Sequence, residues 1–114
     1  ISTVKAFLRK LGISYIAAGE HELDYAVALA KLKYKFHIET LMLGGGGVLI
    51  WSFLQANMCD EVSTVLAAAA DADPATPPLF RAKEELSDSR PLEFTLKEAK
   101  AMDGNSLYCK SMIS

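Results

Sequence analysis

The chain has 114 residues, of which 51% are hydrophobic and 23% are charged, and its formal net charge is −2. A chain of this length forms one domain at most, here residues 1–114, and its hydrophobic content suits a packed core and excludes disorder as the default. Because positive charge is not in excess, the sequence predicts no binding to nucleic acid and no attraction to anionic membrane surfaces.

Cysteine and histidine usage bears on metal binding and on the cell compartment. Cys59 and Cys109 lack metal-ligand spacing, and His21 and His37 lie far from both in the sequence, so we expect no metal site. No apolar stretch reaches the roughly 18 to 20 residues of a membrane span, and the N-terminus shows no secretion signal. We therefore expect a cytoplasmic protein with reduced thiols.

The first part of the chain alternates predicted helices and strands. An amphipathic helix runs from the N-terminus to Gly12, and the β-rich run Ile13–Ala18 predicts a first strand. After a turn at residues 19–22, an apolar stripe predicts a second helix over Leu23–Phe36. Its C-terminal half is rich in lysine, which complements the helix dipole and indicates a solvated face.

The most informative stretch is Thr40–Ala56, in which four consecutive glycines separate two apolar runs. Thr40–Leu43 is typical of a strand buried on both faces, and Leu49, Phe53 and Leu54 recur at helical spacing. The stretch therefore predicts a strand, a tight turn and a helix. Glycines let backbone N–H groups approach an anion, and the helix dipole favours a phosphate by roughly 0.3 to 1 kcal/mol.

Two interpretations of the four glycines stay open. The turn does not match GxGxxG with a downstream acid, and it lacks the Lys-Ser/Thr pair of a P-loop. The glycines either bind a phosphate at the carboxyl end of a strand, or they only permit a sharp turn and close helix packing.

The rest of the chain predicts a strand, a loop, a short helical turn, a polar turn and a hairpin. The strand is Val62–Ala70, the loop is Asp71–Pro78, the helical turn is Ala82–Leu86 and the polar turn is Ser87–Pro91. The hairpin joins Leu92–Leu96, which is continued or kinked through Met102, to Ser106–Ile113 across the turn Asp103–Asn105. The order of predicted helices and strands along the whole chain indicates an α/β fold: a mainly parallel sheet with flanking helices and a C-terminal antiparallel hairpin.

Four motifs along the chain match one family pattern. They are Thr40-Leu-Met-Leu-Gly-Gly-Gly-Gly-Val-Leu, Ser52-Phe-Leu, Cys59-Asp-Glu-Val and Asp103-Gly-Asn-Ser-Leu-Tyr. Together they resemble the riboflavin-biosynthesis reductase domain of the dihydrofolate-reductase-like pyrimidine reductases. The resemblance implies a dihydrofolate-reductase-like fold whose N-terminal part is missing from this sequence, so we expect a truncated domain.

The resemblance also implies an activity and a cofactor site. Members bind NADPH and pass hydride to a pyrimidine-type or related small substrate. The glycine turn faces the cofactor diphosphate, which gives Gly44, Gly45, Gly46, Gly47, Val48 and Leu49 as cofactor-binding residues, with Leu49 packing beneath the turn. Asp60 and Glu61 are expected to be structural, and no residue is identified as a catalytic proton donor.

Three departures from the family pattern leave the function open. Many relatives carry Glu, Asn and Pro where this chain has Gly44, Ile50 and Ala68. One alternative is a non-catalytic relative that acts as a dimerising interaction module, and another is an unrelated α/β phosphate binder. An open sheet edge would favour a homodimer, or strand exchange with the missing N-terminal segment.

Overall fold

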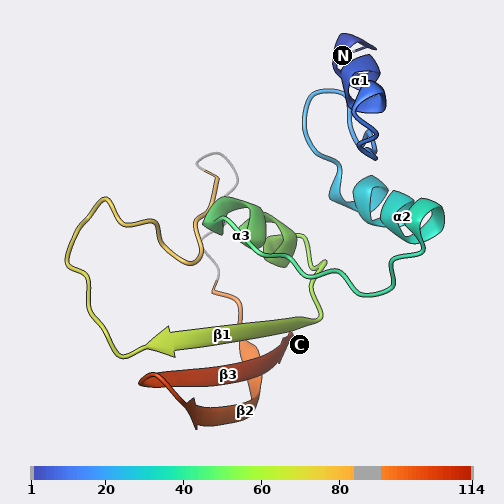
Figure 1. Cartoon of the computed structure of the whole chain (residues 1–114). Helices are drawn as coiled ribbons and strands as arrows, with labels where there is room; N and C mark the ends of the chain where they lie inside the picture. The colour runs from blue at the N-terminus through green and yellow to red at the C-terminus, as the bar shows by residue number, and fades with distance from the viewer. Residues whose placement is uncertain (1, 84–90, 114) are drawn as a thin grey trace. The chain divides into compact units, whose positions relative to one another are not determined.

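The computed structural model describes residues 2–83 and 91–113 and divides into two compact units, Ile1–Met42 and Leu43–Ser114 (Figure 1). The elements are α1 (Ser2–Lys10), α2 (Tyr25–Phe36), α3 (Gly47–Gln55), β1 (Glu61–Ala67), β2 (Phe94–Met102) and β3 (Ser106–Ile113). The predicted helical turn Ala82–Leu86 and polar turn Ser87–Pro91 lie mostly outside the described residues. One domain over residues 1–114 stays a prediction.

The first unit contains the two helices that the sequence predicts there. Asp24 caps α2, because its Oδ1 accepts a hydrogen bond of 3.0 Å from the N–H of Val27. This bond satisfies an amide that has no partner within the helix. The helix ends at His37, which adopts the left-handed conformation at φ 57°, and Lys33 and Lys35 lie in its last turn, where they complement the dipole.

The two strands predicted in the first part of the chain are wrong. Ile13–Ala18 and Thr40–Leu43 pair with no strand among the described residues. In the first of these segments, the carbonyl of Ala17 instead accepts a hydrogen bond from Nζ of Lys31. Branched and aromatic side chains favour extended backbone, but a strand forms only where a neighbouring strand supplies hydrogen-bond partners.

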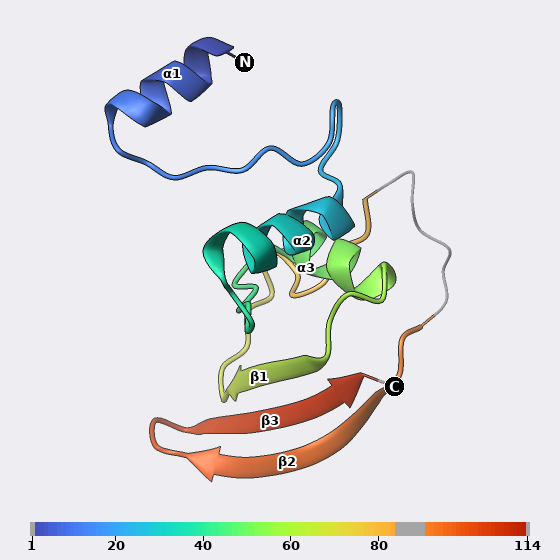
Figure 2. The same cartoon turned by 90° about the vertical axis from the view of Figure 1, so that its right-hand side faces the viewer.

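The second unit holds a three-stranded sheet in the order β1-β3-β2 (Figures 1 and 2). Both pairings are antiparallel, with Cys109 of β3 opposite Thr64 of β1 and Ala99 of β2. The predicted hairpin is confirmed, and a register shift between Leu96 and Glu98 supplies the predicted kink. The prediction of a mainly parallel sheet is wrong. Among the described residues, the segments expected to form parallel strand pairs make no strand pairing.

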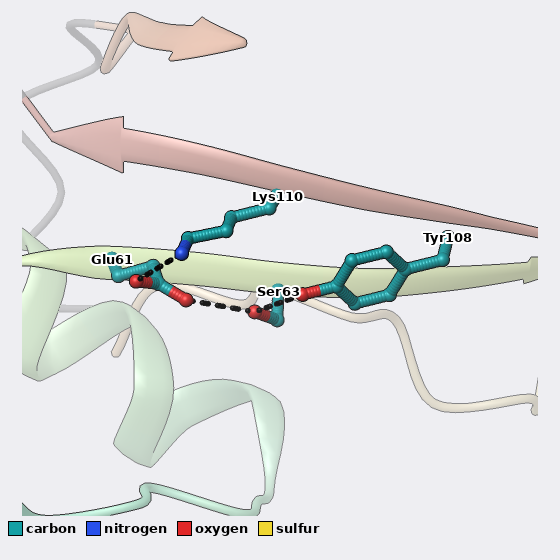
Figure 3. Close-up of polar contacts among 4 residues, drawn as sticks. All are labelled: Glu61, Ser63, Tyr108 and Lys110. Atoms are coloured by element: carbon teal, nitrogen blue, oxygen red, sulfur yellow. Dashed lines mark hydrogen bonds and ion pairs between the residues drawn. The ribbon is translucent and has the colours of Figure 1, made fainter. Parts of the chain in front are cut away.

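The two faces of the sheet differ in chemistry. Residues paired across antiparallel strands project to the same side. One face, here called the polar face, carries Glu61 and Ser63 of β1 with Tyr108 and Lys110 of β3 (Figure 3). The opposite face carries mainly apolar side chains, which include Val62, Leu66, Phe94, Leu96, Leu107 and Ile113.

The core of the described residues is small. Only three hydrophobic side chains are buried among the residues that the structure describes: Ala28 at 7% exposure, Phe53 at 6% and Leu54 at 2%. Two of the three belong to α3, which confirms the predicted apolar stripe of this helix. The burial of α3 is therefore the main hydrophobic contribution to the second unit.

Truncation of this core should be costly. We expect Leu54→Ala to lower the free energy of unfolding by about 2–5 kcal/mol, because it removes buried methyl groups and leaves a cavity. The matched control is Leu96→Ala, whose side chain is 60% exposed and whose loss should cost less than about 0.5 kcal/mol. Urea denaturation followed by circular dichroism measures both, and equal losses would contradict this view of the core.

Candidate functional site

The glycine turn leads directly into α3. Gly46 is the N-cap residue, in extended conformation at φ −76° and ψ −172°, and no side chain caps the helix there. The first helical hydrogen bond joins the N–H of Ile50 to the carbonyl of Gly46 at 3.0 Å. The amides of Gly47, Val48 and Leu49 therefore precede the helical hydrogen-bond series. The first turn holds no acidic side chain that would compete for them.

The space beside the first three glycines is open. A Cβ built on Gly44, Gly45 or Gly46 would meet no atom within 4 Å. Gly45 has φ +144°, which side chains of L residues rarely adopt, and its peptide bond to Gly46 is cis. No neighbouring group therefore crowds this part of the backbone on the side where a side chain would stand.

Gly47 has a different surrounding. A Cβ at this position would lie 2.7 Å from the carbonyl oxygen of Pro78 and 3.1 Å from that of Leu79. The carbonyl of Gly47 also accepts a hydrogen bond of 3.2 Å from the N–H of Arg81. The four glycines therefore differ. Gly47 permits close packing against the helix, whereas the backbone of Gly44–Gly46 is left open to solvent or to a ligand.

Residues 78–81 also contact α3 through aromatic rings. The ring centroids of Phe80 and Trp51 lie 6.2 Å apart at an interplanar angle of 48°. Such tilted pairs contribute about 0.5–1.5 kcal/mol beyond their buried area. The contact of this segment with α3 is not predicted by the sequence, in which the only relevant signal is the pair of adjacent prolines at positions 77 and 78 that stiffen the backbone before Phe80.

Other candidate residues near the turn have structural contacts. The hydroxyl of Ser52 donates a hydrogen bond of 2.7 Å to the carbonyl of Val48, a bond that helical serines often make. Burial, and then the neighbouring Asp60, raise the pKa of Cys59, which makes its thiol a weak nucleophile. Within residues 2–83 and 91–113, no group of three or more His, Cys, Asp or Glu side chains could hold a metal ion.

Glu61 belongs to a cross-strand network on the polar face (Figure 3). Its carboxylate lies 3.4 Å from Nζ of Lys110 and accepts a hydrogen bond of 3.2 Å from Ser63, whose Oγ lies 3.3 Å from the hydroxyl of Tyr108. The ion pair is solvent-exposed, so it contributes only about 0–1 kcal/mol. The network links β1 to β3, and the structural role expected for Glu61 stays a prediction.

No helix in the described parts of the chain is long and apolar enough to cross a membrane.

Comparisons with known proteins point to one family. A family model described as the RibD C-terminal domain matches residues 2–108. Two crystal forms of Acinetobacter baumannii RibD are similar at 19% identity, with TM-scores of 0.77 and 0.76, over 96% of this chain and 29% of theirs. A pyrimidine reductase-like protein from Corynebacterium diphtheriae is similar at 16% identity, with a TM-score of 0.80, over 99% of this chain and 44% of its own.

These similarities to solved structures establish the fold alone. At 16–19% identity they show a shared α/β, dihydrofolate-reductase-like fold, as the motifs implied. This chain spans less than half the length of these solved proteins. No curated protein matches the sequence significantly.

The contrast between the glycines can be tested by a matched pair of variants. We expect Gly47→Ala to lower the free energy of unfolding by about 1–3 kcal/mol, because its methyl group would overlap the carbonyl of Pro78. Gly44→Ala should change it by less than about 0.5 kcal/mol, since its methyl group enters open space. Urea denaturation measures both, and two equal effects would show that Gly47 is not in close contact.

The stability of the loop before residue 78 should depend on pH. Hydrogen bonds from the hydroxyl of Thr76 and from the N–H of Asp73 lower the pKa of Asp71. Because this pKa is depressed on folding, the carboxylate stabilises the loop above its unfolded-state pKa, and this contribution is lost as pH falls through the lowered folded value. In an NMR titration, Thr76→Val should raise the pKa of Asp71, and an unchanged titration curve would contradict the contact.

Proposed function

This chain belongs to the RibD C-terminal domain family, and from that membership we propose that it provides the cofactor-diphosphate turn of an NADPH-dependent reductase. The complete reductase transfers hydride to a pyrimidine-type or related small substrate. The membership confirms the family that the motifs indicated. The name of the pyrimidine reductase-like neighbour supports the proposed substrate class.

The observation that carries the proposal is that the amides at the start of α3 have no hydrogen-bond acceptor among the described residues. Amides at Gly47, Val48 and Leu49 precede the helical series without a side-chain cap, and open space lies beside Gly44–Gly46. Backbone donors at the positive end of a helix dipole suit a diphosphate. The donor set and the clearance therefore fit the cofactor.

Each residue of the turn has a role in this proposal. The N–H groups of Gly45, Gly46, Gly47 and Val48 donate to the diphosphate oxygens, while Gly44 keeps the approach free of a side chain. Leu49, which is half-buried, packs beneath the turn. NADPH supplies the hydride when bound, and this chain binds and orients it.

The proposal also covers location and partners. We place the reductase in the cytoplasm, which suits the free thiols of Cys59 and Cys109. Its partners are the small-molecule substrate and a protein strand that pairs with its sheet, from a second copy of the chain or by strand exchange. Nucleic acid and membranes are not among the proposed partners.

Among the described residues β1 pairs on one side only, and this favours a second candidate function, a non-catalytic module that forms a homodimer or exchanges strands. β1 is an edge strand, and its Val65 and Leu66 are both 66% exposed. β2, at the other edge, carries Lys97 and a register irregularity, two devices that protect edges against pairing. The unprotected edge of β1 is therefore the one suited to another strand.

A charge at the N-cap tests the cofactor site. Gly46→Asp would cap the α3 amides and place a carboxylate where the diphosphate binds, whereas Gly46→Asn caps them without charge. In a titration followed by NADPH fluorescence, we expect Gly46→Asp to weaken binding by about tenfold or more relative to Gly46→Asn, or about 1.4 kcal/mol.

The same titration separates the two candidate functions. NADPH binding by the unmodified protein, with selective loss in Gly46→Asp, supports the reductase. A stable dimer in gel filtration that binds no NADPH supports the interaction module and overturns the reductase proposal.

A further inference from the structure

Residues 78–81, here called the clasp, contact α3 at two points. The carbonyls of Pro78 and Leu79 pack against Gly47, whose own carbonyl accepts the N–H of Arg81. One turn further along the helix, the ring of Trp51 contacts the ring of Phe80. The clasp thus touches both the residue that begins the helix and the residue one turn later.

The chain that leads into the clasp is itself ordered by local hydrogen bonds. Asp71 accepts from the N–H of Asp73 at 2.8 Å and from the hydroxyl of Thr76. Asp73 in turn accepts from the N–H of Ala75 at 2.9 Å. Pro77 then precedes Pro78, and proline rings fix the backbone φ angle. The clasp is therefore held in position by its own loop as well as by α3.

The first turn of α3 needs an external support of this kind. The helix has nine residues, and its N-cap contributes no side-chain hydrogen bond. Isolated helices shorter than about 12 residues are marginal in water, and their ends fray first. If the first turn frayed, the amides of Gly47 and Val48 would lose their common direction, and an anion bound there would lose these two donors.

We propose that the clasp positions the first-turn amides of α3 for the cofactor diphosphate, and that Phe80 is the positioning residue through which it does so. This inference rests on the proposed function, since it names what holds the diphosphate site in its binding geometry. Phe80 acts through Trp51 and the helix, and it does not touch the cofactor. Prior organisation of the amides improves affinity because binding no longer has to order them.

The competing explanation is that the same contacts only stabilise the loop. A purely structural role predicts that loss of Phe80 lowers stability and leaves the NADPH affinity of the folded protein unchanged. A positioning role predicts weaker binding at temperatures and protein concentrations at which the variant is fully folded. The two explanations therefore differ in a binding constant measured on folded protein.

The experiment compares Phe80→Ala with Phe94→Ala in the whole chain. Phe94 is also half-buried in the second unit but lies on β2, so it serves as the matched control. Circular dichroism first establishes the range in which each variant is folded, and NADPH and inorganic pyrophosphate are then titrated. We expect Phe80→Ala to weaken both ligands by about tenfold and Phe94→Ala by less than about twofold.

Two further variants keep the test decisive if Phe80→Ala does not fold. Phe80→Tyr keeps the ring and should bind NADPH as the unmodified protein does, whereas Phe80→Leu loses the ring contact with Trp51 and should bind about threefold more weakly. Equal affinity of the Tyr and Leu variants would overturn the inference.

The outcomes also distinguish this inference from the proposed function. If the unmodified protein binds NADPH and the loss of Phe80 leaves that affinity unchanged, the positioning role is wrong and the reductase proposal stands. If Phe80→Ala and Phe94→Ala weaken binding equally, the effect is general destabilisation and the inference is again overturned. If the unmodified protein binds neither NADPH nor pyrophosphate, both the inference and the proposed function fail.

Discussion

The close contact between Gly47 and the carbonyls of residues 78 and 79 determines where α3 can begin. No residue larger than glycine fits there without displacement of the backbone of the clasp, because a Cβ would lie 2.7 Å from an oxygen atom. The contact sets the first helical turn beside a segment that is fixed by prolines and by its own hydrogen bonds. The direction of the first-turn amides, and with it the proposed anion site, depends on this packing.

A small core makes such local contacts important for the second unit. Phe53 and Leu54 are its only buried hydrophobic residues among those described, and both belong to α3. Much of the sheet is exposed, including Val65 and Leu66 on the unprotected edge strand β1. Exposed apolar surface beside an open edge is typical of a region that pairs with another strand. Because Phe53 and Leu54 belong to α3, the helix that supplies this core also carries the proposed site.

The sequence predicted well wherever the signal was local. Apolar spacing predicted the three helices, and Asp103–Asn105 predicted the hairpin between β2 and β3. The strands Ile13–Ala18 and Thr40–Leu43 were wrong because pairing depends on distant partners that propensity does not reveal. At the candidate site, four identical glycines could not be told apart by sequence. Only the position of residues 78–81, distant in sequence, shows that Gly47 serves packing while Gly44–Gly46 remain open.

In the proposed function, backbone amides at the start of α3 bind the diphosphate of NADPH. An amide-resolved NMR titration with NADPH measures this directly, since each N–H reports its own hydrogen bonding. We expect the largest saturable shifts at the amides of Gly45, Gly46, Gly47 and Val48, with matching shifts when inorganic pyrophosphate is used. Saturable binding that leaves these four amides unshifted, or no binding at all, would contradict it.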